Sequence, residues 1–336
     1  MRGAKPFREK ESTLLEKREQ HTLRGVLCTT LGGVCWGFSG TCGQYLFSGY
    51  EISALQLTCI RLLSSGIILA LMAVPKHRKE LWAVLRQPKE LAELACYGVF
   101  GLMLCQFSYM TAISHSNAAT TTVLQTLSLI FIMLIACLRV RRRPNRREGA
   151  ALVLALAGTY ILATGGDPRH MVLSGQGLFW GLLTAAAVTV YSLLPRRLLA
   201  KWGRSVVTGV GMLIGGLVLN LLARSWANPV QLPPAGWLAV LATVLLGSVV
   251  AFSLFMQGIS DVGPVKASML AATEPLSATV FTVLWLGTKF SAADLIGFVL
   301  ITATIFLLAK ESPAEPAKEP AADPSGEPAG EAPDRN

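Results

Sequence analysis

The chain of 336 residues is 52% hydrophobic and only 15% charged, with a formal net charge of +10 at pH 7. Soluble domains carry about 25% charged residues, so this composition excludes an ordinary soluble enzyme, and the many apolar residues exclude disorder, a collagen-like fibre and a disulfide scaffold. The basic residues lie in short segments between apolar runs, which argues against a nucleic-acid partner. The composition therefore predicts a polytopic membrane protein with the lipid bilayer as its main partner.

Ten apolar windows follow one another along the chain, and each is close to the length of about 20 residues that a helix needs to cross a bilayer. We therefore predict an all-α integral membrane fold with ten transmembrane helices, over residues 25–47, 53–74, 91–113, 117–138, 149–165, 174–194, 205–223, 235–257, 264–285 and 291–309.

Two polar segments flank these windows. Residues 1–24 lack the pattern of a secretory signal, so we expect a cytosolic tail in front of a retained helix. Residues 311–336 contain six prolines and no large apolar residue, and we predict a disordered cytosolic tail there.

Lys and Arg are distributed unevenly over the connections between the windows. One side, with both tails and the start of the ninth window, holds 26 of them, whereas the other side holds only Arg169, Arg224 and Lys289. Since basic residues favour the cytosolic side, we expect both termini in the cytosol and the chain in the plasma (inner) membrane.

Residues typical of metal or cofactor sites do not cluster. The seven cysteines lie in or at the ends of apolar windows and form no C-x-x-C pair, and the four histidines stand singly in tails and loops. The sequence also lacks the phosphate-binding motif GxxxxGK[ST]. We therefore expect no metal, no cofactor and no ATP hydrolysis by this chain.

The chain contains an internal repeat. A shift of 146 residues places the third and fourth windows on the eighth and ninth without a gap, with identities such as Gly101 with Gly247. We infer two five-helix repeats, residues 25–165 and 174–310, and because five is an odd number the second repeat enters the membrane from the opposite side. Inverted repeats are characteristic of secondary transporters, in which the substrate site lies near the midplane between the halves.

Several short motifs, in this order and spacing, resemble the drug/metabolite transporter superfamily, and specifically its ten-helix EamA type. They are Gly33-Val-Cys-Trp36-Gly37-Phe-Ser39, Ile60-Arg61-Leu-Leu, Gly263-Pro264-Val-Lys266-Ala-Ser268, Glu274-Pro275 and Asp294-Leu-Ile-Gly297. The first half departs from the pattern, because Ser128-Leu129 stands where the second half has Glu-Pro. The resemblance implies transport of a small metabolite, frequently export of an amino acid or a related compound.

Two charged residues at mid-depth in the predicted helices are the main site candidates. Arg61 lies roughly 12 Å from the membrane surface, where burial of an arginine costs about 2.5–3.5 kcal/mol. It is either a structural clamp between helices or a contact for an anionic substrate group. Glu274 either pairs in the packing or binds substrate or a coupling proton. Pro275 should kink the helix and free the carbonyl of Ala271 beside this carboxylate.

Further candidates are uncharged or lie near the surface. Trp36 forms either an aromatic cavity wall or part of the core. Thr121 and Gln125 belong to a polar flank that either bonds between helices or lines the cavity. Lys266 lies one turn into the ninth window, where it either extends to the interface or faces a cytosolic vestibule.

These observations favour a secondary transporter that works by alternating access on a small-molecule substrate. The resemblance implies export as the direction of transport. Proton coupling and a homodimer are both compatible with the sequence. The alternatives are an integral-membrane channel or structural subunit and, less favoured because no catalytic cluster appears, an integral-membrane enzyme.

Overall fold

The computed structural model describes residues 5–167 and 169–309, and these residues form helices and connections without any strand. The predicted tail 311–336 lies outside the described residues. The first half comprises α1 (Lys5–Gly49), α2 (Ala54–Leu85), α3 (Pro88–Cys96), the π-helical segment η1 (Tyr97–Met103), α4 (Leu104–His115), α5 (Ala118–Gln125), α6 (Ser128–Arg139) and α7 (Arg146–Thr164). The second half comprises α8 (Gly175–Leu193), α9 (Arg196–Trp202), α10 (Arg204–Ala223), the short 3₁₀ turn η2 (Ser225–Ala227), α11 (Pro234–Val244), the π-helical segment η3 (Leu245–Val250), α12 (Ala251–Val262), α13 (Pro264–Leu270), α14 (Thr273–Leu286) and α15 (Ala292–Ala309).

Helices lie over all ten predicted windows, which confirms the all-α membrane fold. Six continuous helical stretches are long and apolar enough to cross a membrane. The number of ten crossings stays a prediction. At the N-terminus, α1 begins at Lys5 and continues without a break through the first window, so the polar segment and the predicted span form one helix.

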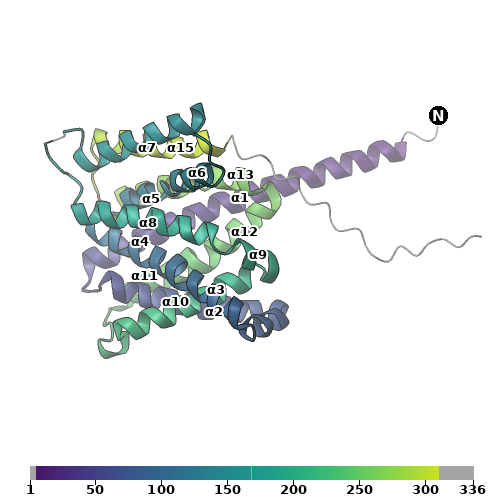
Figure 1. Cartoon of the computed structure of the whole chain (residues 1–336), viewed down its shortest axis with the longest axis horizontal. Coiled ribbons are helices and arrows are strands. Elements are labelled where there is room, and N and C mark those ends of the chain that lie inside the picture. Colours follow the sequence, from purple (N-terminus) through teal and green to yellow (C-terminus); the bar gives the residue numbers. More distant parts are fainter. Residues whose placement is uncertain (1–4, 168, 310–336) are drawn as a thin grey trace, which may run out of the picture.

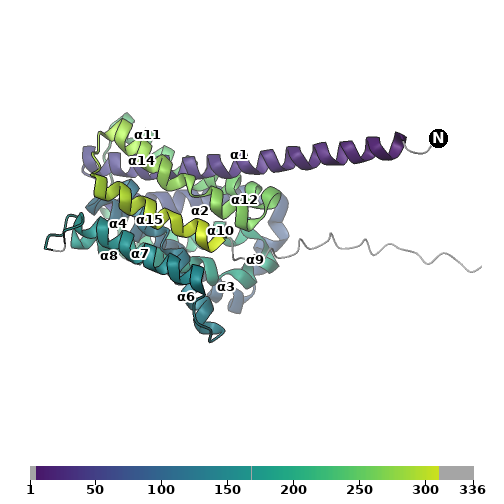
Figure 2. The ribbon, with the colours of Figure 1, turned by 90° about the horizontal axis from the view of Figure 1, so that it is seen from above.

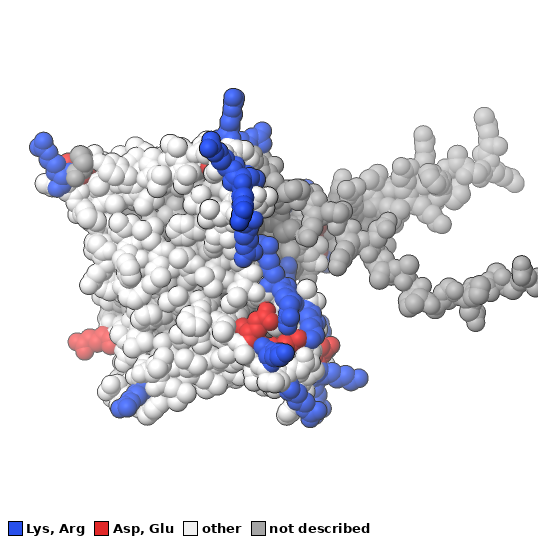
Figure 3. Space-filling view, viewed as in Figure 1, with Lys and Arg blue, Asp and Glu red and all other residues white. Residues whose placement is uncertain are grey.

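The long helices pack into one bundle, and α1 projects from one end of it (Figure 1). In the second view, α15 runs toward that same end (Figure 2). Lys and Arg gather near this end on the visible face, whereas a wide band across the middle carries no Lys, Arg, Asp or Glu (Figure 3). An uncharged band between charged ends is the surface expected of a protein whose sides face lipid.

The helix interruptions repeat with the predicted register. The fourth window breaks at residues 126–127, between α5 and α6, and the ninth breaks at 271–272, between α13 and α14. A shift of 146 residues superposes these two breaks to within one residue, and it brings η1 to within two residues of η3. The two halves therefore share their irregular features as well as their hydrophobic pattern.

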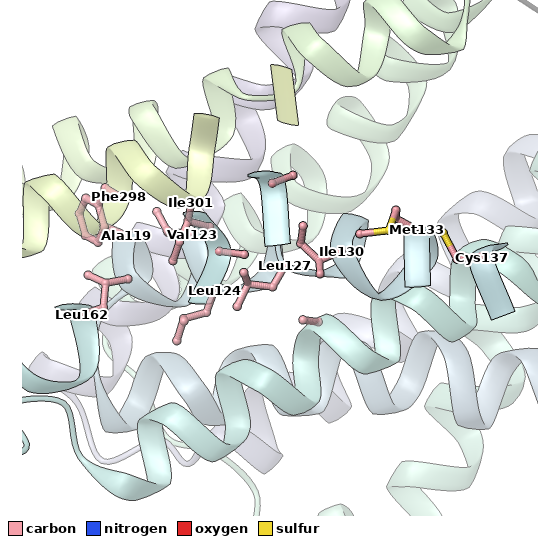
Figure 4. Close-up of a cluster of buried hydrophobic side chains, with 13 residues drawn as sticks. Ala119, Val123, Leu124, Leu127, Ile130, Met133, Cys137, Leu162, Phe298 and Ile301 are labelled. Atoms are coloured by element: carbon pink, nitrogen blue, oxygen red, sulfur yellow. Dashed lines mark hydrogen bonds between the residues drawn. The ribbon is translucent and has the colours of Figure 1, made fainter. Parts of the chain in front are cut away.

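A buried apolar cluster joins the two halves along one side. It contains Val123 and Ile130 from α5 and α6, and Phe298 and Ile301 from α15 (Figure 4). Beside it, α7 and α15 approach closely, because a Cβ atom on Gly158 would lie 3.0 Å from the carbonyl oxygen of Gly297. Only a residue without a side chain permits this backbone contact.

Candidate functional site

A cavity of about 120 Å³ lies between the two halves, and four of the predicted site residues line it. Its walls come from α1, α2, η1, α4 and α5 of the first half and α8, η3, α12 and α14 of the second half. The lining residues are Trp36, Arg61, Leu102, Cys105, Gln106, Tyr109, Gln125, Val188, Tyr191, Gly247, Phe252 and Glu274.

The two helix breaks deliver polar residues to this cavity. Gln125 is the last residue of α5, immediately before the break in the fourth window. Glu274 lies in the first turn of α14, immediately after the break in the ninth. The N-terminal turn of a helix carries a partial positive charge and unsatisfied N–H groups, so it favours a carboxylate. The breaks thus place an amide and an acid at mid-depth in the bundle.

Arg61 reaches the cavity from α2 with most of its hydrogen-bonding capacity unused. The residue is only 4% exposed. Its Nε donates one long hydrogen bond of 3.5 Å to Ser248 Oγ, and Nη1 is buried without any partner. A buried donor without a partner costs free energy, and a charged donor costs more than a neutral one. The long bond to Ser248 and the attraction of the Glu274 carboxylate offset part of this cost.

Glu274 faces the same cavity and also lacks a direct partner. Its carboxylate makes no hydrogen bond or ion pair within residues 5–167 and 169–309, and Arg61 is too distant for an ion pair. Two opposite charges therefore line one small cavity without touching each other. A ligand with groups of both signs would contact both of them.

Aromatic rings form much of the remaining wall. Trp36 packs against Phe252 with ring centroids 5.4 Å apart at 85°, an edge-to-face contact, and against Phe255 at 5.1 Å. Tyr109 is fixed from the other side, because its hydroxyl lies 2.8 Å from Thr122 Oγ1. These contacts hold the rings in place, so the cavity has aromatic wall residues as well as charged ones.

Three predicted site residues do not line the cavity. Thr121 is fully buried, and its hydroxyl lies 3.1 Å from Ser116 Oγ in the turn before α5. Pro275 is buried behind Glu274, within α14. Lys266 lies exposed on α13, away from the cavity lining.

The expectation of a free carbonyl at Ala271 is wrong. The helix does break before Pro275, but the Glu274 amide donates to the Ala271 carbonyl oxygen at 2.9 Å. The chain tightens into a turn with a three-residue spacing at this point, and that turn satisfies the carbonyl that a proline kink would otherwise leave free.

Sequence reasoning missed several cavity residues, among them Gln106, Tyr109, Tyr191 and Phe252. The repeat contained a signal for one pair, because the shift of 146 residues aligns Gln106 with Phe252. Once one face of the eighth window lines the cavity, the equivalent face of the third is expected to do so as well.

Ion pairs between described residues lie outside the cavity. Arg24 contacts Asp261 through two hydrogen bonds of 2.8 and 2.7 Å and so ties α1 to α12. Lys201 and Arg197 of α9 contact Glu90 of α3 at 2.5 and 3.6 Å. These contacts join one half of the chain to the other without using either charge of the cavity.

The family model of the EamA-like transporter family matches residues 23–164 and, a second time, residues 175–310. The chain belongs to this family. The match covers both repeats and confirms the resemblance to the drug/metabolite transporter superfamily. This EamA-family chain is therefore a multi-pass membrane transporter.

Individual relatives agree with this family. The chain is 34% identical to the inner membrane transporter YicL of Salmonella typhimurium, itself uncharacterized, over 87% of this chain and 97% of the relative. It is 23% identical to a probable terminal-alkyne amino-acid exporter of Streptantibioticus cattleyicolor, over 86% of this chain and 94% of that protein. A solved structure titled only "Crystal structure of protein" matches with a TM-score of 0.56 at 24% identity, over 87% of this chain and 99% of the other, and it supports the fold alone.

Proposed function

We propose that this chain is a secondary transporter that exports a small zwitterionic metabolite, an amino acid or a related compound, through the central cavity. The observation that carries the proposal is the pair of unpaired opposite charges, Arg61 and Glu274, on one cavity. The amino-acid exporter among the relatives supports the substrate class and the direction.

The proposed binding mode assigns one substrate group to each charge. A substrate carboxylate contacts the Arg61 guanidinium, whose planar array of donors suits two carboxylate oxygens. The substrate ammonium contacts Glu274, and the amides of Gln125 and Gln106 supply further hydrogen bonds. The substrate side chain packs on Trp36 and the aromatic wall. Thr121, Pro275 and Lys266 act only indirectly in this scheme.

Alternating access follows from the two repeats in this proposal. The cavity lies between halves that share the same helix breaks, and a small rearrangement about those breaks would expose it to one side at a time. Glu274 couples the cycle to protons: a proton on the carboxylate replaces the substrate ammonium during the return step. The cavity is lined by residues of one chain, so the cycle does not require a homodimer.

The test is efflux from proteoliposomes loaded with three matched sets of solutes: amino acids, the amines that lack the carboxylate, and the acids that lack the amino group. We expect saturable efflux of zwitterions only, with an imposed pH gradient changing its rate. Unsaturable efflux of all three sets would favour the channel alternative. A change in the chemical identity of the solutes would favour an enzyme.

The membrane orientation is part of the proposal. We infer a plasma-membrane location with both termini in the cytosol, supported by the distribution of Lys and Arg. Single cysteines on a cysteine-free background should react with an impermeant reagent in intact cells at positions 48 and 167. Labelling at 142 or 197 in intact cells would contradict the orientation.

A further inference from the structure

The connection between α6 and α7 concentrates positive charge in a short segment. Residues 139–147 contain six arginines, and all six are exposed. Of the six, only Arg142 forms side-chain hydrogen bonds or an ion pair with residues that the structure describes. The side chains of the other five form no hydrogen bond or ion pair with the residues that the structure describes. We call residues 138–148 the basic hairpin.

The basic hairpin is a built turn with a defined internal structure. Arg142 donates two hydrogen bonds of 2.6 Å to the carboxylate of Glu148, which is itself only 5% exposed. Asn145 caps α7 by accepting from the amides of Arg147 and Glu148 at 3.0 and 2.9 Å. Arg141 occupies the left-handed region with φ of 51° and turns the chain. One arginine thus shapes the turn that presents the others.

Apolar residues flank the charges on the same turn. Leu138 is 76% exposed and Val140 is 70% exposed. The hairpin follows the end of α6 and projects from the side of the bundle, so the rest of the protein does not cover it (Figure 2). Exposed apolar residues next to arginines at the end of a membrane helix suit the boundary between acyl chains and headgroups.

We propose that the basic hairpin binds anionic phospholipid headgroups, such as phosphatidylglycerol, in the leaflet that contains this end of α6. The five free guanidinium groups match phosphate oxygens in charge and in geometry. Leu138 and Val140 enter the acyl region at the same time. A nucleic acid or a soluble polyanion would satisfy the arginines but would leave both apolar side chains in water, so the lipid is the better partner. Basic clusters next to a membrane helix attract anionic lipid by about 1 kcal/mol per residue, which favours several arginines acting together.

The experiment compares two variants of the full chain that lose the same number of charges. The hairpin variant is R139Q/R141Q/R143Q/R146Q/R147Q, which keeps the Arg142–Glu148 contact. The matched control is K76Q/R78Q/K79Q/R86Q/K89Q, which removes the five basic residues at the end of α2, at the start of α3 and between them. Native mass spectrometry of the purified chain, titrated with phosphatidylglycerol or with phosphatidylcholine, measures the bound lipid.

We expect the hairpin variant to bind phosphatidylglycerol about tenfold or more weakly, the control to change much less, and phosphatidylcholine binding to stay constant. Equal losses of phosphatidylglycerol binding in both variants would show that the binding depends on overall surface charge. That result would overturn the proposal. Displacement of the lipid by inorganic phosphate would overturn it as well. If the hairpin variant fails to fold, the salt dependence of the wild-type chain is the test. Its phosphatidylglycerol binding must fall with rising salt, because salt screens the charges. Binding that is insensitive to salt would refute the site.

Discussion

Replacement of Arg61 by methionine should stabilise the protein while it abolishes transport. Burying an arginine at mid-membrane costs about 2.5–3.5 kcal/mol. A good hydrogen bond to a charged group returns about 1.5–3 kcal/mol, but the single bond to Ser248 is long, at 3.5 Å, and Nη1 has no partner. The guanidinium therefore destabilises the empty protein by about 1–2 kcal/mol on balance. Methionine fills a similar length without the charge, so Arg61→Met should raise the unfolding free energy by about that amount.

The measurement combines thermal unfolding in detergent with efflux from proteoliposomes. We expect a higher unfolding midpoint in Arg61→Met together with loss of zwitterion efflux. Arg61→Lys, which keeps the charge but not the planar donor array, is the matched control and should retain weaker transport. If Arg61 is instead a structural clamp between helices, the opposite result is expected. Arg61→Met should then lower the unfolding free energy by about 3–5 kcal/mol, and the double variant Arg61→Met with Glu274→Gln should recover it. That outcome would refute the assignment of Arg61 to substrate binding.

Three further predictions concern other parts of the chain. Glu274→Gln should keep the fold but lose the effect of a pH gradient on efflux, since the amide cannot ionise; gradient-driven efflux at the wild-type rate would contradict a coupling role. A Cβ at residue 247 would lie 2.0 Å from Ser39 Oγ, so Gly247→Ala should cost about 1–3 kcal/mol in thermal unfolding, whereas the control Gly175→Ala, which has open space, should change little. Arg142 holds the pKa of Glu148 down to about 2 from the ordinary 4.5, so the ionised carboxylate stabilises the fold above pH 4.5 and this contribution is lost as the pH falls toward 2. The midpoint difference between wild type and Glu148→Gln should shrink over that range, and a constant difference would show that this ion pair does not stabilise the fold.

Charge and periodicity made part of the site predictable. Arg61 and Glu274 could be assigned to a shared interior because charged side chains at mid-depth cannot face lipid. The repeat register relates the helix breaks of the two halves to each other. Neither argument depends on how the helices pack, and both apply to a single sequence.

The rest of the cavity depended on tertiary packing. Tyr109 and Tyr191 lie in apolar windows, where an aromatic ring fits lipid, core and cavity equally well. Thr121 lies four residues before Gln125 and so shares its helix face, yet its hydroxyl contacts Ser116 in the turn before α5. Because α5 is only eight residues long, its first turn contacts the adjoining connection and its last turn reaches the cavity. Sequence spacing alone does not separate these two environments.

The helix breaks affect both the stability of the protein with an empty cavity and its proposed transport function. A continuous helix through the ninth window would surround Glu274 with satisfied backbone groups, whereas the break gives the carboxylate the N-terminal turn of α14. The same break replaces regular helical hydrogen bonds with the shorter-spaced turn at Ala271, and breaks of this kind are sites at which helices change direction. Among the described residues Arg61 forms no direct ion pair and its Nη1 has no hydrogen-bond partner, so a substrate that contacts both charges gains free energy that the protein alone leaves unused. Local departures from good packing of this kind concentrate at functional sites. The positions that make the empty protein less stable are therefore the positions to which our proposal assigns zwitterion binding and the rearrangement of the bundle.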